Sequence, residues 1–175
     1  MDEKRWMLRH FLAALAYRTQ KAFRGAPGSF AAFEAGNRVR TPHDLLLHMT
    51  SVLGYALTFF EGGSYRPEKL DDFDAEVERF HGKLVALARH LEEGTPLRGT
   101  TPERMLQGPF SDAMTHAGQL AMLRRLAGAP VPPENFIVAD IDPENLGSEQ
   151  PEPVSPDAVR TETDRSLFMT RTEVM

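Results

Sequence analysis

Residues 41–63 read TPHDLLLHMTSVLGYALTFFEGG, and this stretch decides the fold. Thr41 can cap a helix, Pro42 suits its first position, and Asp44 favours the positive end of the helix dipole. The apolar residues that follow form a broad face, which is typical of a helix buried in a bundle: Leu45, Met49, Val52, Leu53, Ala56, Phe59 and Phe60. The paired glycines at the end of the stretch predict where this helix stops.

Three further helices are predicted around this stretch. The first spans residues 3–24, where apolar residues recur near helical spacing until the sequence RGAPGS. The next lies between residue 71 or 72 and residue 94, and its apolar residues follow heptad spacing. The last covers residues 101–126, with a break expected at the sequence QGPF of residues 107–110, because proline is costly inside a continuous helix.

No strand-rich region competes with these helices, so the sequence predicts an all-α fold, an up-down four-helix bundle formed by residues 1–130. Residues 131–175 are expected to form a proline-rich extended C-terminal arm. The segment NFIVADI, residues 135–141, is apolar enough for part of this arm to pack on the bundle or on a neighbouring subunit. From about residue 151 onward we expect the arm to be mobile.

The composition is that of one soluble globular domain of 175 residues. The net charge of -5 and the scattered basic residues argue against a nucleic-acid partner. We interpret the densest basic spot, Arg124 and Arg125, as binding the negative end of the last helix's dipole. The charged N-terminal segment fits neither a signal peptide nor a membrane span, so we expect a cytoplasmic protein without a membrane partner. A small-molecule substrate is expected only at the candidate site described next.

The chain has no cysteine, so any metal site must use histidine and carboxylate side chains. Asp112 and His116 lie four residues apart, and a helix places such residues on one face, with Gln119 three residues further on. His48 lies in the middle of the helix predicted after Thr41, on a face that we expect to point inward. These residues are the candidate site.

Two interpretations of this candidate site are open on spacing alone. Helical bundles build metal sites from two ligands on one helix and a third on a facing helix, and three ligands leave a coordination position for water or substrate. The alternative is a hydrogen bond between Asp112 and His116 inside the bundle, with His48 a separate imidazole.

The remaining histidines and the large aromatic residues are assigned structural roles. His43 lies in a predicted first helical turn and His90 in a predicted last one, where a surface position or an interaction with the helix dipole is expected rather than metal binding. His10 and His81 can face the interior as hydrogen-bonded groups. Trp6 is expected in the core together with several phenylalanines.

Two motifs resemble a known family. The run THAGQLAMLRRLAG, residues 115–128, resembles the end of the fourth helix in the DinB-like (DinB/YfiT) superfamily, where a histidine, a small or basic residue and Gly-Gln recur. The run RTPHDLLLHMTSVLGYA, residues 40–56, resembles that family's second helix. The resemblance covers residues 5–130 in architecture. The family usually carries a three-histidine metal site, with one ligand from the second helix and two from the fourth.

The resemblance implies a ligand set for this chain. His48 matches the first family ligand and His116 the last, whereas Asp112 stands where the common pattern has histidine. A divalent metal ion held by two imidazoles and one carboxylate is therefore expected, zinc or nickel first, with iron or manganese as alternatives. The resemblance also makes Gln119 a group that hydrogen-bonds near the metal, and Gly118 a residue that permits close helix approach.

The resemblance further implies an activity. Characterised relatives include S-transferases and isomerases that use a low-molecular-weight thiol such as mycothiol or bacillithiol, and many relatives are homodimers. A metal-dependent enzyme of this kind would activate the thiol sulfur at the metal. Two other functions stay open: a non-catalytic dimeric bundle whose site is structural or vestigial, favoured by the lack of an obvious general base, and a metal-dependent hydrolase.

Overall fold

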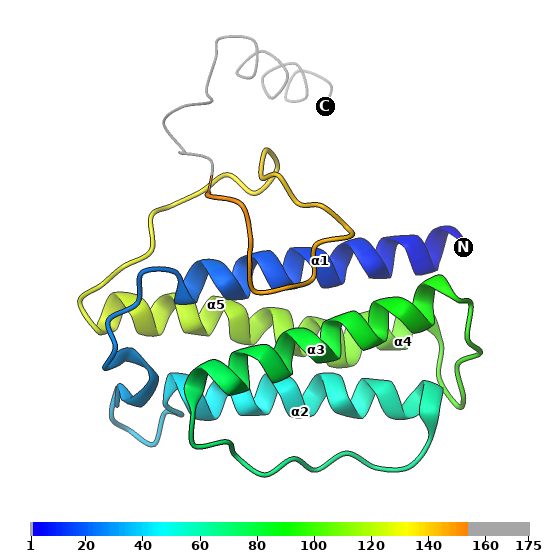
Figure 1. Ribbon diagram of the computed structural model, residues 1–175, viewed down its shortest axis with the longest axis horizontal. Coiled ribbons are helices and arrows are strands. Elements are labelled where there is room, and N and C mark those ends of the chain that lie inside the picture. The colour runs from blue at the N-terminus through cyan, green and yellow to red at the C-terminus, as the bar shows by residue number, and fades with distance from the viewer. Residues whose placement is uncertain (1, 154–175) are drawn as a thin grey trace, which may run out of the picture. The chain divides into compact units, whose positions relative to one another are not determined.

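The computed structural model describes residues 2–153, and over this range the chain is all-helical without a β-strand (Figure 1). Four helices have 16 to 21 residues each: α1 (Glu3–Phe23), α2 (Pro42–Glu61), α3 (Phe73–Glu92) and α5 (Ser111–Leu126). They confirm the four helices predicted from the sequence. Within the described range, no helix has both the length and the apolar character needed to cross a membrane.

Polar side chains define where the helices begin. Side chains at the starts of α1, α2, α3 and the short helix α4 (Pro102–Met105) accept hydrogen bonds from backbone N–H groups that have no partner within the helix. These capping residues are Asp2, Thr41, Asp72 and Thr101. Pro42 occupies the first turn of α2, as predicted, because its missing N–H would have no partner there anyway. At the other end, Gly62 adopts φ 84°, a left-handed conformation that favours glycine and stops α2.

The long helices pack on one another through their apolar faces. Both α1 and α2 contact α3 and α5, so the apolar stripes of all four helices meet in one core. The largest fully buried side chains are contributed by α1, α2, α3 and two short turns, and α5 adds the fully buried Leu120. Outside α5 they include Leu12, Leu15, Tyr17, Phe30, Leu46, Met49, Leu53, Phe60, Phe80, Leu84, Leu87 and Phe110. This packing sets α2 beside α5.

The predicted break in the last helical region is present. The short helix α4 (Pro102–Met105) leads into η2 (Leu106–Phe110), a π-helical turn, and then into α5. Gly108 has the non-helical angles φ -93° and ψ -107°, and Pro109 follows inside the turn. Because Pro109 has no N–H to donate, the regular helical ladder cannot pass through it. The turn η2 also contacts α2, which brings it close to the candidate site.

Residues 141–150 form part of the same compact unit as residues 2–131. Leu146 is buried, and its carbonyl oxygen lies 2.8 Å from Nδ1 of His81 on α3. Arg9 of α1 pairs with Glu144. Packing on the bundle was expected from the segment 135–141. Leu146 gave no such signal, because it is an isolated apolar residue between polar neighbours.

Residues 132–140 belong to a second unit, in which the N–H of Val138 donates to the carbonyl of Asn135 at 3.1 Å. The extended arm over residues 131–175 stays a prediction. The mobility expected from residue 151 falls almost entirely on residues 154–175, which lie outside the described residues.

Two assignments of aromatic and histidine side chains from the sequence are corrected. Trp6 is 52% exposed and stacks on His10, since it lies on the opposite side of α1 from the buried Leu8. His43 is buried, with its ring edge against Phe73, because the start of α3 covers the first turn of α2. Burial, followed by the charge of Lys69, lowers the pKa of His43.

Arg124 binds helix C-terminal carbonyls, but chiefly those of a different helix. Its guanidinium donates to the carbonyl oxygens of Ala22, at 2.7 Å, and of Arg24, at 3.0 Å, at the end of α1. It also donates to Ala129 just beyond α5. Arg124 therefore links the ends of α1 and α5, while Arg125 is exposed.

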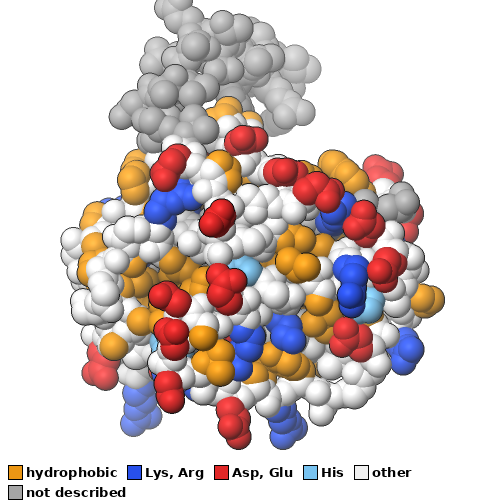
Figure 2. Space-filling view, in the orientation of Figure 1, with side chains coloured by type: hydrophobic (Ala, Val, Ile, Leu, Met, Phe, Trp, Pro, Cys, Tyr) orange, Lys and Arg blue, Asp and Glu red, His pale blue; other side chains and the backbone are white. Residues whose placement is uncertain are grey.

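On the face that Figure 2 shows, acidic and basic side chains are interspersed rather than gathered by sign.

Candidate metal centre

The three predicted ligands lie together in space. His48 extends from the middle of α2, and Asp112 and His116 from the first half of α5. His116 Nε2 lies 3.3 Å from Asp112 Oδ1, and His48 Nε2 lies 3.7 Å from Asp112 Oδ2. One ligand atom from each residue lies within 4.8 Å of the other two. This cluster is the only group of three or more histidine and acidic residues with such spacing among the described residues.

The local structure explains this meeting. The helix α5 buries Ala113, Ala117 and Leu120 in the core, and this rotation leaves Asp112 and His116 at the edge of the contact with α2. Residues four apart on α5 share one face, as the spacing predicted. Packing of α2 against α5 then supplies His48 from the other side.

The cluster is more open to solvent than the sequence suggested. The side chains of His48, Asp112 and His116 are 31%, 48% and 11% exposed. Tyr55 follows His48 by seven residues on the same face of α2, which was expected to point inward, and its side chain is 54% exposed. The inward orientation of this face is therefore wrong, because α3 and α5 cover other sides of α2 and leave this edge accessible. A small molecule can reach Asp112 from solvent.

Gln119 contacts the cluster from its own helix. Its Oε1 lies 2.8 Å from Nδ1 of His116. An amide oxygen only accepts hydrogen bonds, so the contact places a hydrogen on Nδ1 of His116 and leaves a lone pair on Nε2 in the neutral ring. This is the arrangement in which metal-binding histidines are usually held, with one nitrogen on the metal and the other donating to a fixed acceptor.

The electrostatic surroundings favour a neutral His48. Partial burial is the largest cause that lowers its pKa, and the positive charge of Arg40 and the neighbouring His116 ring add to it. The carboxylate of Asp112 opposes these effects. Since a metal binds the deprotonated imidazole nitrogen, the lowered pKa keeps His48 in the binding form at neutral pH.

The geometry fits a cation. With the hydrogen of His116 on Nδ1, its Nε2 and the Asp112 carboxylate oxygen, 3.3 Å apart, are both acceptors and form no hydrogen bond with each other. A cation between them, or protonation of His116, relieves this repulsion. Tetrahedral zinc, with bonds of about 2.0–2.2 Å, holds its ligand atoms roughly 3.3–3.6 Å apart. The distances of 3.3 and 3.7 Å from Asp112 to the two imidazoles are close to that range, and they run to the two different oxygens of Asp112. With one ligand atom from each residue, the three atoms lie within 4.8 Å of one another, so binding of zinc would draw them closer.

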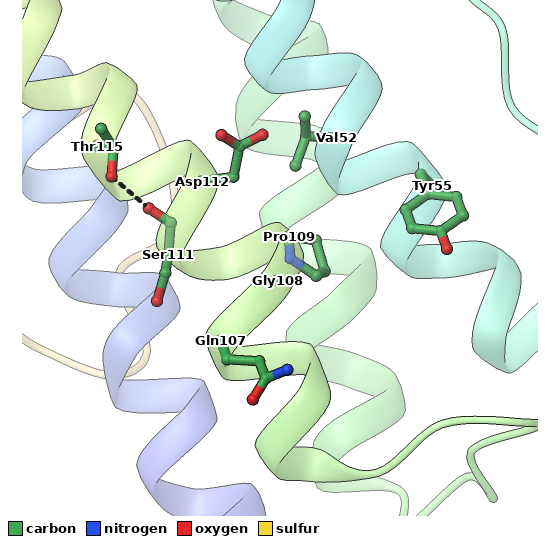
Figure 3. A pocket seen from close by; sticks show the side chains of 8 residues that line it. All are labelled: Val52, Tyr55, Gln107, Gly108, Pro109, Ser111, Asp112 and Thr115. Atoms are coloured by element: carbon green, nitrogen blue, oxygen red, sulfur yellow. Dashed lines mark hydrogen bonds between the residues drawn. The ribbon is translucent and has the colours of Figure 1, made fainter.

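A pocket of about 520 Å³ adjoins the cluster (Figure 3). Its lining residues come from α2, η2 and the start of α5: Val52, Tyr55, Gln107, Gly108, Pro109, Ser111, Asp112 and Thr115. Asp112 belongs to both the pocket and the cluster. The sequence did not indicate a pocket at the other lining residues. The nearest signals were the break expected at residues 107–110 and the face of the helix that carries His48, to which Val52 and Tyr55 belong.

Gly118 does not have the role expected for it. A Cβ atom added at Gly118 would meet no atom within 4 Å, so no helix approaches closely at this position. Gly118 is exposed on the outer side of α5, where close packing is not required.

Comparison of the chain with models of protein families gives no match, and comparisons with curated proteins and with solved structures give none either. The cluster of His48, Asp112 and His116 could hold a metal ion, and that conclusion rests on its geometry.

Proposed function

We propose that this chain is a four-helix bundle of the DinB-like superfamily and a metal-dependent enzyme that uses a low-molecular-weight thiol. The connection after α2 returns along that helix, with Tyr65 against Gly54, so α2 and α3 run in the same direction and the up-down order of neighbouring helices is not kept (Figure 1). The second and fourth long helices, α2 and α5, supply the cluster, as the family pattern implies. His48, Asp112 and His116 would hold the divalent metal, zinc or nickel by preference, with iron or manganese as alternatives.

One observation supports this proposal most strongly. His116 Nε2 lies 3.3 Å from the Asp112 carboxylate with its hydrogen on Nδ1, and Asp112 also lines a solvent-accessible pocket. A purely structural metal site is normally closed by four protein ligands, whereas three ligands beside a pocket leave room for a substrate atom. The openness of the site therefore favours a catalytic role over a structural one.

Each residue has a stated part in this proposal. A divalent metal, when bound, lowers the pKa of a coordinated thiol and so supplies a nucleophilic thiolate at neutral pH. His48 and His116 provide neutral nitrogen ligands, and Gln119 fixes the orientation of His116. Asp112 contributes the one negative charge of the ligand set.

Thiol consumption by the full-length chain tests the activity. The protein, loaded with zinc or nickel, would be incubated with mycothiol or bacillithiol and monochlorobimane as the electrophile. We expect metal-dependent formation of the thiol adduct, abolished in His48→Ala and retained in His10→Ala. His10 is a suitable control because it stacks on Trp6 in α1 and takes no part in the cluster. Circular dichroism of both variants checks that folding is retained.

The alternatives give different results in the same experiment. A structural site predicts that Asp112→Ala and His116→Ala lower the melting temperature while no thiol adduct forms in the parent. A hydrolase predicts metal-dependent cleavage of an ester such as p-nitrophenyl acetate without any thiol. The family resemblance also supports a homodimer, which light scattering after size-exclusion chromatography measures directly.

A further inference from the structure

The pocket extends from the cluster toward the C-terminal end of α2. Val52 and Tyr55 follow His48 by four and seven residues, so they continue the same face of α2. The facing wall is formed by η2 and the first turn of α5, whose chain direction is opposite to that of α2. Asp112 therefore lies where the pocket meets the cluster (Figure 3).

The lining is apolar on one part and polar but uncharged on another. Val52, Tyr55 and Pro109 supply apolar surface, and the ring of Tyr55 is supported by an edge contact to Phe59 at 5.0 Å between ring centres. Gln107, Ser111 and Thr115 supply amide and hydroxyl groups. Among the described residues that line the pocket, Asp112 carries the only charge.

Two of the polar groups are available to a ligand. The side chain of Gln107 forms no hydrogen bond within the part of the chain that the structure describes, so its amide can both donate and accept. Thr115 donates its hydroxyl hydrogen to the carbonyl of Ser111 at 2.9 Å, and its oxygen can still accept a hydrogen bond. The volume of about 520 Å³ is within the range of small-molecule sites.

We propose that this pocket binds the electrophilic second substrate of the metal centre, and that this substrate is an uncharged molecule with a planar apolar group and an amide or carbonyl group. The inference rests on the proposed function. The planar group packs on Tyr55 and Val52, while the polar group hydrogen-bonds to Gln107. A carboxylate or phosphate in this place would face the charge of Asp112 without a cation in the lining to balance it.

Binding of two matched probes to the full-length chain tests this inference. Benzamide and benzoate have nearly the same shape and differ in charge. Each would be titrated into 15N-labelled protein with EDTA present, so that no metal takes part, and backbone amide shifts would be followed. We expect benzamide to shift the amides of Gln107, Gly108 and Ser111 saturably, and benzoate to bind at least about tenfold more weakly.

Two variants make the test specific to the pocket. Tyr55→Ala removes the exposed ring and should weaken benzamide binding at least about fivefold. Met122→Ala is the matched control, since Met122 is 62% exposed on α5 and does not line the pocket, and it should leave the affinity unchanged.

The outcomes separate the pocket from the metal centre. Equal binding of benzoate and benzamide, shifts confined to residues outside the pocket, or an unchanged affinity in Tyr55→Ala would overturn the inference. Saturable benzamide binding, together with a separate titration that finds no metal binding, would support the ligand class and contradict the proposed function instead.

Discussion

At the scale of single residues, each ring nitrogen of His116 lies beside a different side chain of its own helix. Gln119 Oε1 lies 2.8 Å from Nδ1, and Asp112 Oδ1 lies 3.3 Å from Nε2. The first contact determines which nitrogen carries the hydrogen, and the second places a carboxylate oxygen beside the nitrogen that carries none. Gln119 thus acts on a metal only through the orientation and tautomer of His116.

Replacing Gln119 should weaken metal binding without unfolding the chain. In Gln119→Leu the acceptor for Nδ1 of His116 is lost, and we expect zinc affinity to fall about 10- to 100-fold. Gln119→Glu keeps an acceptor oxygen and serves as the matched control, with affinity close to that of the parent. Competition with a fluorescent zinc chelator measures both constants. Equal affinities in the parent and in Gln119→Leu would contradict the assigned role.

The candidate ligands could be predicted because their signal is local. Asp112 and His116 share a helical face by spacing alone, and His48 lies on a helix whose caps are visible in the sequence. Tyr55 and Gln107 could not be predicted as pocket residues, because the contact between α2 and η2 brings them together across a long stretch of chain. Sequence spacing carries no information on that distance.

At the scale of elements, two glycines in the long helices have opposite environments. A Cβ atom at Gly54 of α2 would overlap the ring of Tyr65, which comes from the connection between α2 and α3. The same ring lies beneath Nζ of Lys83, at 4.4 Å from the ring centre. The ring of Tyr65 therefore packs directly against the backbone of α2 at Gly54, whereas Gly118 of α5 has open space around it.

Alanine at these two positions should have effects of opposite sign. Gly54→Ala must displace Tyr65 and should lower the free energy of unfolding by about 1–3 kcal/mol. Gly118→Ala meets no neighbour and should raise it by about 0.5–1 kcal/mol, since alanine loses less backbone freedom than glycine in a helix. Urea unfolding of both variants measures these changes. A loss of stability in Gly118→Ala would contradict this prediction and would indicate that a helix approaches closely at Gly118.

The helix bounds were predictable, whereas the contacts between helix ends were not. Thr41, Thr101 and the glycines after α2 are local signals, and the structure confirms them. Arg124 was assigned to the dipole of its own helix, but its guanidinium reaches the end of α1 about a hundred residues earlier in the chain. A long, flexible cationic side chain can bind either set of carbonyls, and only the packing of α1 on α5 decides between them.

At the scale of the whole molecule, buried histidines make the fold sensitive to acid. Burial lowers the pKa of His81, although its hydrogen bond to the carbonyl of Leu146 and the charge of Glu78 oppose this effect. Its Nε2 is buried with no hydrogen-bond partner among the described residues, so a second proton there would be unsatisfied. The pKa of His43 and the pKa of His48 are lowered as well, with burial as the largest cause.

The sign of the resulting pH dependence follows from linkage. His81 has a lower pKa in the folded chain than its ordinary value of 6.5, so the unfolded chain binds the proton first as the pH falls. Its contribution to stability is complete above pH 6.5 and is lost progressively below it. His81→Gln cannot titrate but can still donate to Leu146, so its free energy of unfolding should decrease less between pH 7.5 and pH 5 than that of the parent. Equal decreases in urea unfolding would contradict this account.

The metal content of the purified chain tests directly whether His48, Asp112 and His116 form a metal site. Protein made without an affinity tag would be incubated with zinc, nickel or manganese, dialysed and measured by elemental mass spectrometry. We predict about one equivalent of metal per chain in the parent and in His10→Ala, and little in His48→Ala and His116→Ala. A parent protein that retains no metal after any of these incubations would contradict the assignment of His48, Asp112 and His116 as a metal site.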